Sequence, residues 1–438
     1  MPVTLDRQYW PDSLPLNGSD YFQLLLDRHH RRQGLQGNVS RFAVEVEGKL
    51  DAAALERTVN GDPLFIWLHS LRLKRRLPFQ LPQWKQVKAN RPVSIGIHEV
   101  FLKGHGIPGV LFETDIRPHS DPPFRLDLVF HQNNRTTLFF TWNHVLTDAQ
   151  GAEILIRHLG KAIGDGQVQF FAKEETELPI REQVGHARKV RDFMFDGQET
   201  GLSLLLEKSG HPQANRYRVL RFTETETAQV NANCKRYGIR FGRSPLLLAA
   251  AMRSFHALLK HKGKTNHNIW VPIPQNQRKK GAWGPLVGNH VSYLFYRLFP
   301  QHLETMQSAA DAIGEQMMGQ MRSGIPASYG IMMGLSRRLP LWLYGYIAKS
   351  PTKGALASFF FSDTGNTLDD FTNFCGLPVS DAVHYPPNGG YPGFTVIFMG
   401  FQQKLQAVIA YTEAGVSEAE LSIFEASLRE NLFGKTVV

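Results

Sequence analysis

The pattern of hydrophobic and polar positions changes its period once within the stretch Thr136–Gly160. Up to Asn143, apolar and polar residues alternate and many are β-branched or aromatic, which predicts a strand. After Asp148 the apolar residues recur at helical spacing, so we expect a helix with Asp148 as its N-cap. His144 therefore lies in the turn between a strand and a helix, and such strand ends face ligand clefts in α/β folds.

The first half of the chain alternates between these two periods. The predicted elements are a helix capped by Asp20, a strand over Asn38–Glu47, a helix capped by Asp51, and a hairpin of Arg125–His131 with Thr136–Asn143. The pair Asn133-Asn134 suits the hairpin turn because Asn tolerates a positive φ. His29 and His30 are adjacent in the first helix and cannot share a face, so we predict a solvated helix end there and no metal site.

The second half also interleaves strands and helices. Its predicted strands are Arg216–Phe222, Asn268–Pro274, Gly288–Leu298, Ala355–Ser362, Gly393–Gly400 and Lys404–Thr412. Its predicted helices lie within Arg181–Phe195, after a Thr223/Glu226 capping box, from an N-cap at Ser244, over Leu303–Met321 and Tyr329–Ile347, and after a Ser417/Glu420 capping box. Interleaved elements of this kind indicate an α/β fold. We predict an N-terminal lobe over residues 1–175, a linker over 176–214 and a C-terminal lobe over 215–438.

Composition and charge narrow the classes of partner. A chain of 438 residues with 42% hydrophobic and 20% charged residues can bury a large core. Its net charge of +10 favours anionic partners, such as the phosphates of CoA, an acidic carrier protein or an anionic lipid surface. Nucleic acid is the generic alternative, but the sequence has no zinc-finger spacing, RNP-type motif or long basic helix.

Several features predict a cytoplasmic protein. The two cysteines, Cys234 and Cys375, form no CxxC pattern, as expected in a reducing compartment. The first residues lack the pattern of a signal peptide, and no apolar stretch is long enough to span a membrane. For the short apolar stretch Leu339–Ala348 we predict a buried core helix, with peripheral contact at a membrane surface as the alternative.

His144 suits proton transfer because the unperturbed pKa of an imidazole lies near neutral pH. The structural alternative is a histidine satisfied by its neighbours, with Asp148 only a helix cap. Motifs for a nucleophilic serine are missing, since the sequence has no GxSxG elbow and its SxxK match at Ser350–Lys353 lacks the SDN and KTG motifs. His261 and His267 have no companions at metal-ligand spacing, so we predict no metal site.

The segment Pro122–Gly151 resembles the active-site hairpin of the CoA-dependent acyltransferase superfamily. That superfamily includes chloramphenicol acetyltransferase, peptide-synthetase condensation domains, plant alcohol acyltransferases and bacterial wax ester synthases, and its signature is HHxxxDG. Here His144 matches the second His and Asp148 the Asp, whereas Asn143 replaces the first His and Ala149 the Gly. The second His carries the chemistry in that family, so the central part of the motif is kept.

Further stretches resemble family landmarks in the same order. VPIPQNQRKK resembles the VP-x-N-x-R stretch of condensation domains, and VGNHVSYLFYRL resembles the GN strand of wax ester synthases. FFFSDTG resembles their SN-x-G stretch, with Asp363 where Asn is usual. GKLDAAALERTV also resembles the beginning of condensation-type enzymes, so the resemblance covers most of the chain.

The resemblance implies two chloramphenicol-acetyltransferase-like lobes of mixed sheet and helices, with an active-site tunnel between them. It implies that His144 is a general base and that Asp148 points away from the substrate and pairs with an arginine, for which we select Arg278. An acyl-CoA or acyl-carrier thioester would be a substrate, and no tightly bound cofactor would be needed. We add Asn143 and Ser362 as candidates for substrate or oxyanion contacts.

Three functional hypotheses follow. The first is an acyltransferase that uses acyl-CoA and a hydroxyl or amine acceptor in lipid or secondary metabolism. The second is a condensation enzyme that takes acyl or aminoacyl groups from a carrier protein. The third is a non-catalytic binding protein of the same fold, which the exchanges at Asn143 and Ala149 would suit.

Overall fold

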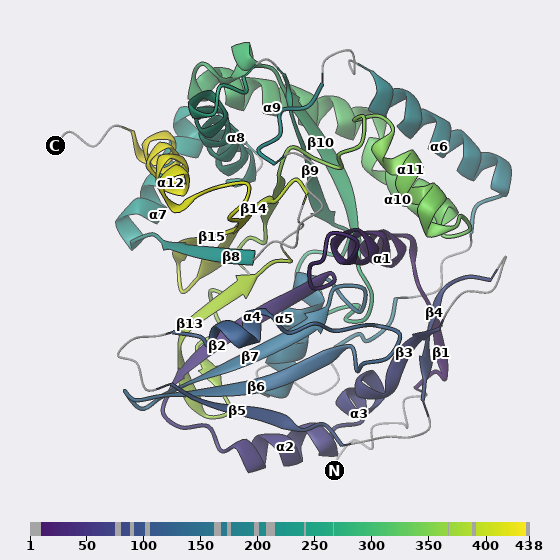
Figure 1. Cartoon of the computed structure of the whole chain (residues 1–438), viewed down its shortest axis with the longest axis vertical. Coiled ribbons are helices and arrows are strands. Elements are labelled where there is room, and N and C mark those ends of the chain that lie inside the picture. Colours follow the sequence, from purple (N-terminus) through teal and green to yellow (C-terminus); the bar gives the residue numbers. More distant parts are fainter. Residues whose placement is uncertain are drawn as a thin grey trace.

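The computed structural model consists of two lobes stacked one above the other, with helix α1 (Gly18–Arg31) between them (Figure 1). The predicted α/β fold class is therefore confirmed. The structure describes residues 10–74, 80–87, 92–100, 106–161, 168–172, 177–196, 201–206, 215–240, 242–265, 267–366, 368–387 and 391–434. Residues 176, 197–200 and 207–214 of the predicted linker lie outside these ranges.

The first lobe is built on a six-stranded sheet. Its order is β12 (Asn373–Phe374), β13 (Leu377–Tyr385), β2 (Val39–Glu47), β7 (Arg135–Asn143), β6 (Phe124–His131) and β5 (Ile95–Val100). Neighbouring strands are antiparallel except for the parallel pair β5 and β6. The predicted hairpin is β6 and β7, and Asn134 in its turn has a φ of 56°. β7 thus ends at the residue before His144, as predicted.

The second lobe contains two further sheets, and a small sheet lies beside the first lobe. One sheet has the order β11 (Phe360–Asp363), β14 (Phe394–Phe401), β15 (Lys404–Thr412) and β8 (Asn215–Arg221), and the other pairs β9 (Ile269–Asn276) with β10 (Val291–Leu298). The small sheet has the order β1 (Ser13–Pro15), β4 (Gln83–Gln86) and β3 (Leu71–Lys74). The strand expected over Ala355–Ser362 is shorter than predicted.

Helices pack against the sheets, and α1 lies between the lobes. Besides α1 they are α2 (Ala52–Gly61), α3 (Pro63–Ser70), α4 (Gly109–Phe112), α5 (Ala149–Leu159), α6 (Ile180–Phe195), α7 (Glu224–Arg236), α8 (Ser244–His261), α9 (Met306–Ser323), α10 (Ile325–Ser336), α11 (Leu341–Lys349) and α12 (Glu418–Phe433), with a 3₁₀ turn at Pro300–Leu303. α8 is buried along most of its length and forms the centre of the second core.

Most predicted helix caps are confirmed. Asp51 and Asp148 cap α2 and α5, and the capping boxes of α7 and α12 are present. Two caps are wrong. Asn17 caps α1, and Asp20 is the acidic third residue of its capping box, so the helix begins earlier than its apolar stripe. Arg243 occupies the N-cap position of α8, because Ser244 already belongs to the helix.

The crossing strand β13 connects the two lobes in a way that the sequence did not predict. β13 lies in the part of the chain assigned to the C-terminal lobe, yet it pairs with β2 in the sheet of the first lobe (Figure 1). The pairing brings the buried side chains of Ala382 and Val383 into the first lobe. The second half of the chain therefore contributes a strand to the sheet of the first lobe, in addition to packing against that lobe.

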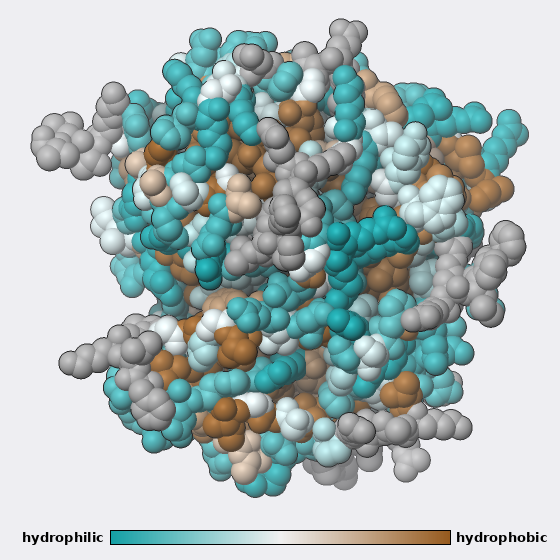
Figure 2. Space-filling view, in the orientation of Figure 1, coloured by the Kyte–Doolittle hydropathy of each residue, from teal (hydrophilic) through white to brown (hydrophobic). Residues whose placement is uncertain are grey.

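Helix α11 corrects the prediction of a buried core helix at Leu339–Ala348. Pro340 separates α11 from α10, and only Tyr344 of α11 is buried. Trp342 and Tyr346 are 61% and 73% exposed. Figure 2 shows pale and brown side chains gathered at the upper right, over the region of α6, α10 and α11. Contact with a membrane surface stays a prediction; within the described residues, no helix has the length and apolar character needed to cross a membrane.

Candidate active site

A cavity of about 150 Å³ lies between the lobes, and the imidazole of His144 forms part of its wall. The loop after β7 fixes this residue, because its backbone N–H donates to the carbonyl of Asn38 at 2.7 Å. Most of the wall is apolar and comes from α1, β9, β10, β11 and β14. The polar side chains that line the cavity are Gln23, His30, Asn38, His144, Ser362 and Thr395.

His144 is held as a neutral imidazole. Its Nδ1 atom lies 3.0 Å from Oδ1 of Asn289, a residue 145 positions away in the second lobe. Burial lowers the pKa of His144, although the nearby carboxylate of Asp148 acts in the opposite direction. At neutral pH the ring is therefore uncharged and can accept a proton.

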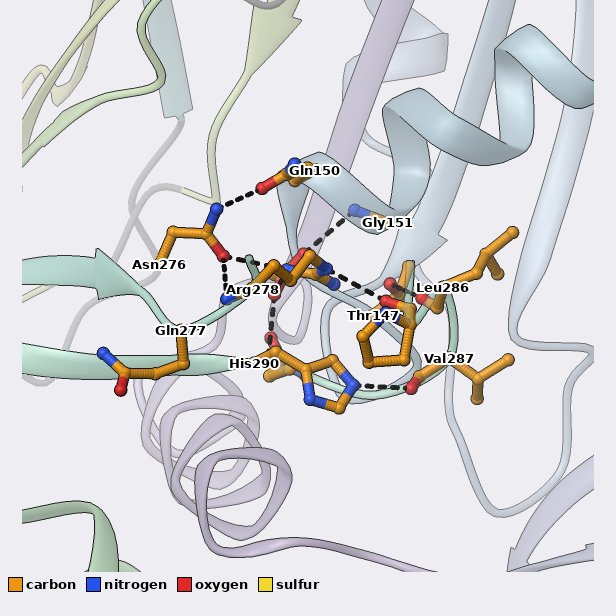
Figure 3. Close-up of polar contacts among 12 residues, drawn as sticks. Thr147, Gln150, Gly151, Asn276, Gln277, Arg278, Leu286, Val287 and His290 are labelled. Atoms are coloured by element: carbon orange, nitrogen blue, oxygen red, sulfur yellow. Dashed lines mark hydrogen bonds and ion pairs between the residues drawn. The ribbon is translucent and has the colours of Figure 1, made fainter. Parts of the chain in front are cut away.

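The predicted pairing of Asp148 with Arg278 is present in the structure. Figure 3 shows Arg278 among its polar contacts, with Gly151 of α5 and His290 nearby. Oδ2 of Asp148 accepts from Nη1 of Arg278 and from the backbone N–H of His290, both at 2.8 Å. Oδ1 accepts from the backbone N–H of Gly151 at 2.9 Å and so caps α5. Burial alone would raise the pKa of Asp148, but the charge and hydrogen bond of Arg278 outweigh it, so the pKa lies below its usual range. Asp148 thus supports the loop of His144 and ties it to the second lobe.

Gly151 also fixes the way in which the lobes meet. A Cβ atom at this position would lie 1.9 Å from Oγ1 of Thr147 and 2.4 Å from the carbonyl oxygen of Leu286. Thr147 donates its hydroxyl to that same carbonyl at 2.5 Å. The first turn of α5 therefore approaches the loop before β10 closely enough to require glycine. Ala149, at the first position of α5, leaves this contact intact.

Asn143, predicted as a candidate for substrate or oxyanion contacts, lies outside the cavity. Its side chain is fully buried, and Nδ2 donates to Oδ1 of Asp27 at 3.1 Å and to the carbonyl of Ile116 at 3.0 Å. Its Oδ1 accepts from the backbone N–H of Val145 at 3.0 Å. Asn143 does not line the cavity, and its hydrogen bonds shape the loop that carries His144.

Ser362 does line the cavity, from strand β11 of the second lobe. The structure thus brings Ser362 and His144 to one cavity from opposite lobes, whereas Asp148 and Arg278 lie behind the histidine. The role of Ser362 as an oxyanion donor stays a prediction. Thr395, on the neighbouring strand β14, lines the same wall and was not identified from the sequence.

His30 corrects the prediction of a solvated end for α1. The side chain is 2% exposed and lines the cavity together with His144. Burial lowers the pKa of His30 to about 4, and the positive charges near it act in the same direction. The neighbouring His29 contacts Lys349 and the carbonyl of Tyr391 instead. The end of α1 is buried because the two lobes enclose this helix, which sequence periodicity cannot indicate.

A second buried histidine, His384, leads to a prediction about stability. Its ring is stacked between Trp142 and Phe42, and neither ring nitrogen has a hydrogen-bond partner among the described residues. Burial and the proximity of His144 lower the pKa of His384 to about 3. An unfolded histidine binds a proton below pH ~6.5, whereas the folded one does not until the pH approaches its lowered pKa. The free energy of unfolding should therefore fall by about 1.4 kcal/mol per pH unit as the pH drops from ~6.5 towards the folded pKa of His384.

We expect His384→Phe to raise the free energy of unfolding at pH 7 by about 1 kcal/mol and to reduce its loss between pH 7 and pH 5. The physical reason is that phenylalanine keeps the stacked ring and removes the unpaired polar atoms. Urea denaturation at both pH values measures this, with His261→Gln, an exposed histidine of α8, as the matched control. A variant that is less stable than the wild type at both pH values would contradict the prediction.

Comparison with known proteins defines the fold. No family profile matches the sequence, and no curated protein matches it. Among solved structures, the first condensation domain of the CDA synthetase aligns with a TM-score of 0.63 and 14% identity over 98% of both chains. Trichothecene 15-O-acetyltransferase from Fusarium sporotrichioides aligns with a TM-score of 0.67 and 14% identity over 96% of this chain and 94% of the other.

The epimerization domain from the third module of tyrocidine synthetase B is similar over 96% of this chain and 95% of the other, with a TM-score of 0.60 and 13% identity. The chain therefore has the two-lobed fold of the CoA-dependent acyltransferase superfamily and of condensation domains, as its motifs indicated. At these identities the likeness establishes the fold alone, so the reaction must be argued from the residues of the cavity.

Proposed function

We propose that the protein is an acyltransferase that moves an acyl group from a thioester to a hydroxyl or amine acceptor, with His144 as the general base. The observation that carries the proposal is the position of His144, a neutral imidazole that lines a cavity between the lobes. The buried pair of Asp148 and Arg278 lies on the other side of its loop and leaves the ring free to face the substrates.

In the proposed reaction the acceptor oxygen or nitrogen attacks the carbonyl carbon of the thioester while Nε2 of His144 takes the acceptor proton. The tetrahedral intermediate then collapses, the C–S bond breaks, and His144 returns the proton to the leaving sulfur. General-base catalysis of this kind contributes ~10²–10⁴ in rate. The hydroxyl of Ser362 is our candidate donor to the oxyanion, because it lines the cavity from the lobe opposite His144.

The nature of the donor is tested by measuring thiol release. Acyl-CoAs and the same acyl groups on a phosphopantetheinylated carrier protein are each offered with alcohol and amine acceptors. We expect thiol release from acyl-CoA that depends on the acceptor, whereas thiol release from the acyl-carrier protein alone would favour the condensation reaction. The solved condensation domains of the same fold are the reason for including that arm. No release from either donor would contradict an acyltransferase and favour a binding protein.

The size of the cavity predicts the size of the acyl group. An apolar cavity of about 150 Å³ accommodates a group the size of benzene, and the cavity beside His144 has this volume. We therefore expect acyl groups of up to about six non-hydrogen atoms to give kcat/KM values at least ~10-fold above that of palmitoyl-CoA, because a longer chain must leave the cavity.

Phe360 lines this cavity and is only partly buried, so its truncation should enlarge the cavity at a modest cost in stability. We expect Phe360→Ala to shift the preferred acyl length upwards by two or more carbons. The matched control is Phe433→Ala, a partly buried phenylalanine at the end of α12. An unchanged length profile in Phe360→Ala would show that the cavity wall does not select the acyl group.

A further inference from the structure

The side chain of Asn289 lies between the base and a buried carboxylate. Its Oδ1 is 3.0 Å from Nδ1 of His144, and its Nδ2 donates to the backbone carbonyl of His144 at 2.9 Å. The same Nδ2 donates to Oδ1 of Asp20 at 2.9 Å, and the backbone N–H of Asn289 donates to this oxygen at 2.6 Å. Both Asn289 and Asp20 are almost fully buried, at 1% and 4% exposure.

These contacts determine which way the amide of Asn289 points. A backbone carbonyl and a carboxylate can only accept hydrogen bonds, so the atom that faces both of them must be the nitrogen. The oxygen then faces His144. Because an amide oxygen has no hydrogen to donate, Nδ1 of His144 must carry the proton in their shared hydrogen bond. In the neutral ring the lone pair is then on Nε2.

The position of Asn289 is itself fixed from two sides. Nδ2 of Asn17 donates to its backbone carbonyl at 3.0 Å. Asp20 accepts from the backbone N–H of Asn17 at 2.9 Å and so belongs to the capping box of α1. The start of α1 thus holds the turn before β10, and that turn holds the imidazole of the other lobe.

We propose that Asn289 and Asp20 are positioning residues that keep His144 in the Nδ1–H tautomer, so that Nε2 is the atom that accepts the acceptor proton. This inference rests on the proposed function for its catalytic consequence, but the tautomer itself is a property of the free protein.

The direct test is the tautomer of His144, read from the ¹⁵N chemical shifts and two-bond ¹H–¹⁵N couplings of the imidazole in histidine-labelled protein at neutral pH. The His144 signals are assigned by their absence from His144→Ala. We expect the Nδ1–H form in the wild type and a mixture of tautomers in Asn289→Leu, which keeps the branched shape of the side chain and removes the acceptor. An Nε2–H form in the wild type would overturn the proposal without any activity measurement.

The kinetic test separates positioning from support of the fold. We expect Asn289→Leu to lower kcat at least ~10-fold with KM changed less than ~2-fold, since the lost interaction orients the base and does not bind the substrate. Asp20→Asn has a single accepting oxygen, so it cannot accept from Asn289 and from the backbone N–H of Asn17 at once. We expect this weaker hold on Asn289 to lower kcat by ~3-fold or more. If Asn289→Leu does not fold, the wild-type spectrum and Asp20→Asn still decide the question.

The control is Asp62→Asn, because Asp62 is also a carboxylate that accepts a backbone hydrogen bond at the start of a helix, but its other contact is His158, which does not line the cavity. Its kcat should equal that of the wild type. Equal kcat values for Asn289→Leu and the wild type would overturn the proposed positioning role. A wild-type protein with the expected tautomer that transfers no acyl group would instead count against the acyltransferase function alone.

Discussion

Replacement of His144 by alanine should lower kcat for acyl transfer by ~10²–10⁴ while the protein keeps its fold. The imidazole lines the cavity on one side and contacts Asn289 on the other. Alanine removes the base and leaves the backbone hydrogen bonds of the loop in place. Thiol release in the presence of an acceptor measures the loss, and circular dichroism checks the fold.

A pH profile of the wild type adds a second criterion. Because burial lowers the pKa of His144, the base becomes protonated only at a lower pH than an ordinary histidine does. We therefore expect kcat to be constant around neutral pH and to fall only as the pH drops through that lowered pKa. His158→Ala is the control, since His158 pairs with Asp62 outside the cavity and its loss should leave kcat unchanged. Equal thiol release by His144→Ala and the wild type would rule out His144 as the base.

Removal of the positive charge at Arg278 should destabilise the protein by about 3–5 kcal/mol, because it leaves the carboxylate of Asp148 buried without its ionic partner. The two side chains are only 1% and 8% exposed. We expect Arg278→Met to show this loss in urea denaturation at pH 7. The stability that Asp148 contributes exists above the unfolded pKa of an aspartate and disappears as the pH falls through its lower folded pKa, so it is fully present at pH 7.

A double variant distinguishes a buried charge from a general packing defect. Asp148→Asn combined with Arg278→Met removes both charges, and we expect it to recover part of the stability lost in Arg278→Met. The exposed pair of Arg191 and Asp192 provides the comparison, since Arg191→Met should cost less than about 1 kcal/mol. A double variant that is less stable than Arg278→Met would show that the carboxylate stabilises the loop in another way.

The sequence was informative where the structure is determined locally. The change of period around His144 predicted a strand, a loop and a capped helix, because alternation, helical spacing and N-caps depend on neighbouring residues. The pairing of Asp148 with Arg278, 130 positions apart, required the resemblance to a known family. Without that resemblance, an arginine in a basic loop would not have been distinguished from a surface residue.

The parts of the site that could not be predicted depend on contacts between the lobes. Asp20 and Asn289 are 269 positions apart, and no local pattern connects a capping-box aspartate with an asparagine before a strand. The buried position of His30 likewise follows from the enclosure of α1 by both lobes. The opposite error occurred for α11, whose apolar residues suggested burial although Trp342 is exposed. Hydrophobicity alone does not indicate which helices the lobes enclose.

The crossing strand β13 has a consequence for the synthesis of the protein. The sheet of the first lobe contains β2 from near the beginning of the chain and β13 from near its end. It cannot be completed until most of the chain has left the ribosome. Until then β2 presents an unpaired edge, which is a site for aggregation. A C-terminal truncation that removes β13 should therefore fail to give a folded first lobe, even though it leaves His144 and all of its neighbours in sequence intact.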